Sequence, residues 1–273
     1  MRHDYCGPSF LAMPEFFSKN EYKYPSNPLD TPFTQSTSEN GFFEYITQSP
    51  ERLTVFQQHL AAKSLAWPKY LDDATFVQEN LIKGAKTDGD AVFLVDVGGG
   101  AGHDLQELAQ KHSDLPGKLV LQDLEGPIGE AKASKLSEKI ELQEHDFFSE
   151  QPVKGNGSDI NVLCVLTTPG ARAYYFKSVL HDWPDDKSLE ILKHLKDALE
   201  PGYSKLLINE RVIPPTGAHW LSTGLDITMM ALFGAKERTE EDWRQLLGLA
   251  GLKIVKIWTW EPAAESLIEA EQA

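Results

Sequence analysis

Residues 92–102, VFLVDVGGGAG, constrain the fold more than any other part of the sequence. The run VFLVDV is almost wholly apolar, which is typical of a strand buried on both faces of a parallel sheet. The glycines that follow allow positive φ and let a ligand approach the backbone closely, and a helical segment, DLQELAQKH, comes next. A buried strand that turns through glycines into a helix is the first unit of an α/β fold.

The alternation of strand and helix continues along the rest of the chain. Further strands are predicted at KLVLQDL, IELQEHDFF, YYFKSVLHDW and KLLINERVI, and helices at IGEAKASKL, DDKSLEILKHLKDAL and TGLDITMMALFG. Thr239, with Asp242 three residues later, resembles a capping box that opens one more helix, and LKIVKIWTW alternates like a late strand. Parallel strands need helical crossovers, so residues 90–273 are predicted to form a doubly wound, Rossmann-like α/β sheet.

The first 89 residues follow a different pattern. Residues 1–41 contain five prolines and several polar runs, so we expect an arm or remnant rather than a domain, with one short helix near PSFLAMPEFF. Residues 42–89 are predicted to be a helical linker, in which Ser49 and Pro50 begin a helix as N-cap and first-turn proline.

The charge of the chain limits its partners. The 41 Asp and Glu residues outnumber the 26 Lys and Arg residues, giving a net charge of −15. Nucleic acids and anionic membranes require basic surfaces, so neither is an expected partner. No apolar run approaches the ~20 residues of a membrane span, and the chain does not begin with the apolar stretch of a signal peptide. Two cysteines make neither a disulfide framework nor a metal cluster. We therefore expect an acidic, cytoplasmic globular protein.

Ligands of open α/β sheets bind at the carboxyl ends of the strands, and polar residues gather there in this sequence. Asp123 ends the second predicted strand, where a carboxylate can accept both hydroxyls of a ribose. Asp146 ends the third, and with Phe147 it suits the exocyclic amine and the ring face of a purine. Taken singly, each is as readily an ordinary turn or core residue. The dinucleotide motif G-x-G-x-x-G fails, because its third glycine falls on His103 or Leu105, so a smaller nucleoside ligand is favoured.

The fourth predicted strand runs into His181 and Asp182. Histidine is the natural base near neutral pH, and a carboxylate can fix its tautomer. A lone His–Asp pair is more often structural than catalytic, however. Glu210, at the end of the fifth strand, and Glu237, before the capped helix, would not be selected on their own.

Six motifs occur in an order that is similar to that of a known family. They are VDVGGGAG, LQDL, HDFF, FKSVLHDWPDDK, INERVIPP and GAKERTEEDW. In this order they resemble the S-adenosylmethionine-dependent O-methyltransferases of the plant caffeate and fungal secondary-metabolism type, from about residue 42 to the end. The resemblance implies transfer of a methyl group from S-adenosylmethionine to a hydroxyl of an aromatic or polyketide-like small molecule, without a metal.

The resemblance also implies roles for individual residues. The cofactor site would comprise Gly98, Gly100, Gly102, Asp123, Leu124, Asp146, Phe147 and Lys177. The catalytic group would comprise His181 as general base, with Asp182, Glu210 and Glu237. The acceptor pocket would comprise Phe56, His59, Leu60, Trp183, Asp226, Met229, Met230 and Phe233. At their helical spacing the two methionines would be core residues in most proteins.

Two other functions stay open. Some relatives of the family use the bound cofactor for a cyclisation or rearrangement, and the chain could also be a truncated, inactive paralogue that only binds the cofactor. Family members carry an N-terminal helical, winged-helix-like domain that forms the dimer and closes the partner's pocket. Only its last part is expected here, so we expect any homodimer to be weak.

Residues 155–169, GNGSDINVLCVLTTP, depart from the family pattern, in which QPVK runs directly into GARAYY. One interpretation is a lid or an added strand near the acceptor pocket. The other, which we favour, is a surface excursion or a retained intron that the core sheet does not need.

Overall fold

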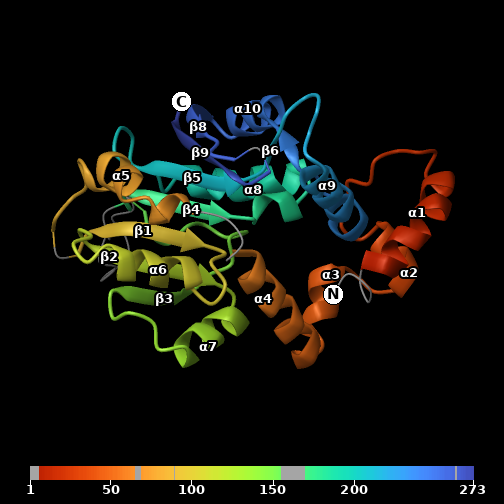
Figure 1. Cartoon of the computed structure of the whole chain (residues 1–273), viewed down its shortest axis with the longest axis horizontal. Helices are drawn as coiled ribbons and strands as arrows, with labels where there is room; N and C mark the ends of the chain where they lie inside the picture. Colours follow the sequence, from red (N-terminus) through yellow and green to blue (C-terminus); the bar gives the residue numbers. More distant parts are fainter. Residues whose placement is uncertain (1–5, 65–68, 89, 155–169, 262) are drawn as a thin grey trace, which may run out of the picture.

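The computed structural model describes residues 6–64, 69–88, 90–154, 170–261 and 263–273, and Figure 1 shows a central sheet with helices on both sides. Its seven strands are β1 (Val92–Val97), β2 (Lys118–Asp123), β3 (Ile140–Glu144), β4 (Ala173–Lys177), β5 (Lys205–Glu210), β8 (Leu252–Trp258) and β9 (Ser266–Gln272). They are ordered β3-β2-β1-β4-β5-β9-β8, with β1 to β5 parallel and β9 antiparallel to both of its neighbours. The chain thus winds outward from β1 in both directions, and the predicted doubly wound sheet is confirmed.

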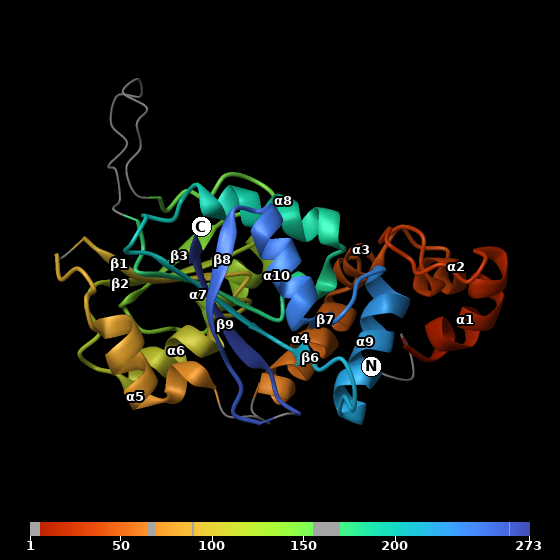
Figure 2. The same cartoon turned by 90° about the horizontal axis from the view of Figure 1, so that it is seen from above.

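Helices cover the two faces of this sheet (Figure 2). One face carries α6 (His103–Lys111) and α7 (Glu125–Ala133), together with the short helices η2 (Tyr70–Asp72), α5 (Ala74–Phe76) and η3 (Val77–Ile82). The other face carries α8 (Asp185–Lys196) and α10 (Glu240–Leu249). Every residue of β1 is buried between these layers, which explains why the strand is apolar at every position except Asp96.

The N-terminal helices gather beside one end of the sheet. They are α1 (Gly7–Lys19), α2 (Pro32–Thr37), α3 (Phe42–Thr47) and α4 (Pro50–Ser64), and they lie near α9 (Trp220–Phe233). A separate apolar cluster joins Phe33, Phe42 and Ile46 to Met229 and Phe233 of α9. The helix expected near PSFLAMPEFF is α1, and α4 begins at Pro50 as predicted. The second helix of the arm, α2, was not predicted.

Two strand ends, and the set of strands, differ from the sequence expectation. The fourth strand ends at Lys177, not near His181, because Ser178 has a φ of +50° that turns the backbone out of the strand. The third strand ends at Glu144, two residues before Asp146. Strand β9 was missed altogether, and a two-stranded parallel ladder of β6 (Val212–Ile213) and β7 (Arg238–Thr239) also forms.

Among the described residues, no helix combines the length and apolar character needed to cross a membrane. Residues 155–169 lie outside the described residues, so the expectation that the sheet forms without them stays a prediction.

The turn before β2 generates a test of stability. Gly117 has a φ of +82°, and a Cβ atom there would lie 2.3 Å from the carbonyl oxygen of Ala91, which also accepts the backbone hydrogen bond of Lys118. We expect Gly117→Ala to lower the free energy of unfolding in urea by more than about 2 kcal/mol, because a backbone clash adds to the cost of positive φ. Gly202→Ala is the matched control, since Gly202 has a φ of +73° and nothing within 4 Å of the added atom. Equal losses in the two variants would show that the clash contributes nothing.

Candidate active site

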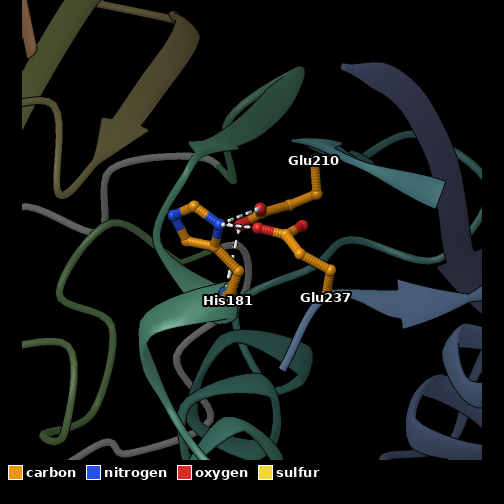
Figure 3. A group of neighbouring side chains, drawn as sticks. All are labelled: His181, Glu210 and Glu237. Atoms are coloured by element: carbon orange, nitrogen blue, oxygen red, sulfur yellow. Dashed lines mark hydrogen bonds and ion pairs between the residues drawn. The ribbon is translucent and has the colours of Figure 1, made fainter. Parts of the chain in front are cut away.

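Three side chains from distant parts of the sequence meet beyond the carboxyl ends of β4 and β5 (Figure 3). His181 lies on a short 3₁₀ helix, η4 (Leu180–Asp182), that follows β4. Glu210 is the last residue of β5, and Glu237 lies directly before β7. The sequence analysis named all three, and the structure brings them together.

The imidazole of His181 is oriented by Glu237. Its Nδ1 atom lies 2.7 Å from Glu237 Oε1 and 3.6 Å from Glu210 Oε2, whereas Nε2 lies 3.5 Å from Asp182 Oδ1. A carboxylate accepts a hydrogen bond, so Nδ1 carries a proton and Nε2 is the atom available for proton transfer. Figure 3 shows Nε2 at the side of the ring that faces away from the two glutamates.

Glu210 holds the turn on which His181 lies. Its Oε1 atom accepts hydrogen bonds from the backbone N–H groups of Val179 and Leu180, each at 2.9 Å. Its Oε2 atom, like Oε2 of Glu237, is buried without a hydrogen-bond partner among the residues that the structure describes. Glu210 therefore contributes both a backbone anchor and a negative charge beside the imidazole.

Burial and charge act against each other in this cluster. Burial lowers the pKa of His181, but the negative charges of Glu210, Glu237 and Asp182 outweigh it and raise that pKa to about 10. Burial raises the pKa of Glu210 to about 7, with the imidazolium charge opposing the rise. In this arrangement His181 is protonated at neutral pH.

Arg238 fixes the same turn from its other side. Its guanidinium donates hydrogen bonds to the carbonyl oxygens of Leu180 and Trp183, each at 2.9 Å, and to Asp185 at 2.8 Å. The side chain is 1% exposed. Arg238 was not predicted as a site residue, although it follows Glu237 within the motif GAKERTEEDW.

The glycine loop lies beside this cluster at the same edge of the sheet. Gly98, Gly100 and Gly102 have φ angles of +72°, +62° and +78°, as their residue type predicted. The Asp123 carboxylate accepts hydrogen bonds from the N–H groups of Gly100 at 2.8 Å and Leu124 at 2.7 Å. A Cβ at Gly98 would lie 3.0 Å from a methyl group of Val179, which ties the loop to the segment that precedes His181.

Lys177 takes part in a buried ion-pair network. Asp104, in the first turn of α6, lies 2.7 Å from Lys177 Nζ through one oxygen and 2.9 Å from Lys69 Nζ through the other. Burial raises the pKa of Asp104, but the two ammonium groups outweigh it and lower that pKa. Lys69 and Asp104 were not predicted, because nothing in the sequence indicates that they pair.

Aromatic rings connect this edge to the N-terminal helices. Trp183 contacts Phe147 and Phe148, with ring centroids 6.0 and 4.8 Å away, and Phe43 stacks near it at 5.9 Å with an interplanar angle of 21°. Phe43 in turn contacts Phe56 and Phe233. The rings of three residues predicted to line the acceptor pocket, Phe56, Trp183 and Phe233, thus share one cluster. Phe43 was not predicted from the sequence.

The other predicted site residues have varied positions. Met229 and Met230 are buried on α9, and Asp226 accepts a hydrogen bond from the Glu237 N–H at 2.9 Å. His59 is exposed on α4, and the side chain of Leu60 lies outside the described residues. Asp146 accepts a hydrogen bond from the N–H of Phe148 at 3.0 Å.

The three central side chains are of the types that ligate metal ions, and their ligating atoms lie within 4.8 Å of one another. Here Nδ1 of His181 already makes a hydrogen bond with Glu237, which favours a role in proton transfer over a role as a metal ligand. The expectation that no metal takes part stays a prediction.

Residues 27–253 match the O-methyltransferase domain family. The chain belongs to this O-methyltransferase family. It is 39% identical over 274 residues to the O-methyltransferase mpaG of Penicillium brevicompactum, covering 99% of this chain and 65% of mpaG. The family resemblance inferred from the six motifs is confirmed.

Solved structures of related proteins share the fold of this O-methyltransferase-family chain. LepI in complex with S-adenosylmethionine superposes with a TM-score of 0.84 at 28% identity, and a protein described as a pericyclic reaction enzyme does so with 0.84 at 27%. Each match covers all of this chain and about two thirds of the other, at 65% and 66%. The chain spans less than two thirds of the length of the curated relatives that it matches.

The charge balance around His181 generates a prediction. We expect Glu237→Gln to lower the pKa of His181 by one unit or more, roughly the effect of removing one close carboxylate. The measurement is a titration of the His181 ring signals by NMR, with His181→Ala identifying those signals. Glu107→Gln, on α6 and paired with Lys69, should leave the His181 pKa unchanged. If Glu237→Gln left the pKa of His181 unchanged, Glu237 would not be one of the charges that raise it.

Proposed function

We propose that this chain is an S-adenosylmethionine-dependent O-methyltransferase with His181 as its general base, acting on a hydroxyl of an aromatic or polyketide-like small molecule. The observation that carries the proposal is the buried His181, with Nδ1 bound to Glu237 and Nε2 left for proton transfer. Membership of the O-methyltransferase family and the 39% identity to mpaG support it.

The residues at the sheet edge fit the cofactor. A Cβ atom added at Gly100 would have nothing within 4 Å, whereas one added at Gly99 would lie 2.5 Å from Asp96. The loop is therefore packed against the protein at Gly99 and open at Gly100. The loop glycines already donate their N–H groups within the protein, for example Gly98 to Gln122 and Gly100 to Asp123, so the N–H groups that a ligand could use are those at the start of α6. Asp123 would hold the ribose hydroxyls, Leu124, Asp146 and Phe147 would contact adenine, and Lys177 would lie by the cofactor. The complex of LepI with S-adenosylmethionine supports this assignment.

The chain's own residues handle one proton in the proposed reaction. The bound cofactor supplies a methyl group on a sulfonium, which needs no metal for activation. His181 Nε2 accepts the proton of the acceptor hydroxyl, a contribution of roughly 10²–10⁴ in rate. His181 must first be neutral, and a positively charged ligand nearby lowers its pKa because like charges disfavour the protonated form. After transfer, Glu237 and Glu210 stabilise the imidazolium.

The aromatic cluster supports an aromatic acceptor. Trp183 lies two residues after His181, and its ring contacts Phe43 on one side and Phe147 on another. Rings in such a cluster bind flat apolar molecules through stacked and edge-to-face contacts. We infer that an acceptor ring is held beside Trp183, so that its hydroxyl lies near His181.

A second candidate function keeps the fold and cofactor but transfers no methyl group. Two observations favour it: the raised pKa of His181, which makes the ring a proton donor at neutral pH, and the likeness to a pericyclic reaction enzyme. Methyl transfer stays our conclusion, because mpaG is the more similar in sequence. An inactive paralogue is the weaker alternative, since His181, Glu210 and Glu237 are assembled in contact.

Methyl transfer is tested with methyl-labelled S-adenosylmethionine, a panel of phenols and mass spectrometry of the products. We expect a labelled product, and we expect His181→Ala to lower turnover at least ~100-fold while S-adenosylhomocysteine affinity stays nearly the same. His194→Ala, on α8 and outside the cluster, is the control and should keep its turnover. Comparable turnover in His181→Ala would refute the base assignment, and a rearranged, unlabelled product would favour the second function.

The cofactor assignment has its own test. We expect Asp123→Ala to weaken S-adenosylhomocysteine binding by about 10- to 100-fold in calorimetry, since charge-assisted hydrogen bonds contribute roughly 1.5–3 kcal/mol. Glu125→Ala, an exposed acid two residues away, should bind like the wild type. Unaltered affinity in Asp123→Ala would exclude Asp123 from the ribose site.

A further inference from the structure

The segment 234–238 runs from the end of α9 into the first residue of β7 and carries Glu237, the residue that orients His181. We call this segment the Glu237 loop. Because Glu237 and Arg238 both contact the turn of His181, the position of this loop sets the position of the imidazole. What holds the loop in place is therefore relevant to the proposed chemistry.

One contact comes from the N-terminal part of the chain, 211 residues away in sequence. The hydroxyl of Tyr24 donates a hydrogen bond to the carbonyl oxygen of Ala235 at 2.8 Å. Close by, Gly234 has a φ of +63°, and a Cβ there would lie 3.0 Å from the carbonyl oxygen of Asn27. The segment 20–31 thus lies directly against the Glu237 loop, at a distance that leaves little room for a side chain at position 234.

A second contact comes from α9. Asp226 accepts a hydrogen bond from the backbone N–H of Glu237 at 2.9 Å. The sequence analysis assigned Asp226 to the acceptor pocket, whereas the structure places its carboxylate on the backbone of the residue that binds His181. Tyr24 and Asp226 therefore hold the loop at Ala235 and at Glu237.

From these contacts we propose that Tyr24 and Asp226 are positioning residues for His181, acting through the Glu237 loop. The segment 20–31 then helps to position the catalytic histidine. This inference rests on the proposed role of His181 as the base. Neither residue is proposed to touch the cofactor or the acceptor.

The charges around the histidine determine the direction of the expected effect. His181 faces Glu237 from the loop, Glu210 from β5 and Asp182 from its own turn, and all three raise its pKa. Tyr24 faces Asp226, Glu237, Asp185 and Arg238, and burial, aided by the acids, raises the pKa of its hydroxyl. The hydroxyl therefore stays a hydrogen-bond donor across the assay range. Loosening the loop weakens the Glu237 contact and so lowers the pKa of His181.

The test compares Tyr24→Phe with Tyr22→Phe. Tyr22 is a suitable control because it lies in the same segment and its side chain is 79% exposed. The substitution removes the same hydroxyl group and does not alter the backbone. We expect Tyr24→Phe to lower kcat on the pH-independent plateau three- to tenfold, and to move the NMR titration of His181 and the acidic limb of the pH–rate profile about half a pH unit downward. Affinity for S-adenosylhomocysteine should stay within twofold. Tyr22→Phe should match the wild type in each measurement.

Asp226 is tested with two variants. Asp226→Asn keeps an oxygen that can accept the Glu237 N–H, so it should stay near the wild type, whereas Asp226→Ala should shift the His181 titration as Tyr24→Phe does. Comparing the two variants separates the effect of losing the hydrogen-bond acceptor for the Glu237 N–H from the effect of losing the negative charge of Asp226. An unchanged His181 titration in Asp226→Ala, or a shift in Asp226→Asn as large as that in Asp226→Ala, would overturn the positioning role of Asp226.

The outcomes separate this inference from the proposed function. A Tyr24→Phe variant with an unchanged His181 titration overturns the inference, even if its melting temperature falls, because a merely structural role lowers stability without moving that pKa. A wild-type protein that transfers no methyl group counts against the proposed function alone, since the histidine titration is measured without turnover. A shift in Tyr24→Phe but not in Tyr22→Phe supports the inference.

Discussion

Two buried carboxylates face one imidazole at the carboxyl edge of the sheet, and the surrounding structure is arranged to keep them there. A buried carboxylate is costly unless a positive charge and hydrogen bonds compensate it. His181 provides the charge, and the N–H groups of Val179 and Leu180 bind one oxygen of Glu210. Arg238 fixes the same turn through carbonyl oxygens on either side of the histidine. The cluster is therefore held by backbone as well as side-chain contacts.

Part of this arrangement could be predicted from the sequence, because strand ends and caps are local features. The glycine loop, Asp123 at the end of β2 and Glu210 at the end of β5 were placed correctly. The capping box formed as well, since Thr239 Oγ1 accepts the N–H of Asp242 at 3.2 Å and the Asp242 carboxylate accepts the N–H of Thr239 at 2.9 Å. The family resemblance then joined residues that composition and spacing alone did not connect.

The remainder depended on contacts between distant segments. Strand β9 reads SLIEAEQ, whose two acids gave no clear period, yet its first five residues are buried between β5 and β8. Ser178 ends β4 early through a left-handed backbone conformation that its residue type does not signal. The N-terminal helices form despite Pro14 inside α1, because α1 and α2 pack on each other and on α9. Tertiary packing of this kind overrides local propensity.

The aromatic cluster and the charge cluster come largely from different elements. Phe43, Phe56 and Phe233 lie on α3, α4 and α9. In the charge cluster, His181 lies on η4, Glu210 ends β5 and Glu237 directly precedes β7. Trp183 lies two residues after His181, and its ring belongs to the aromatic cluster. Substitutions on α3 and α4 could thus reshape the space beside Trp183 while leaving the balance of buried charge intact. In such an architecture the range of accepted molecules can diverge by ordinary point mutation, without each change having to re-establish the proton chemistry.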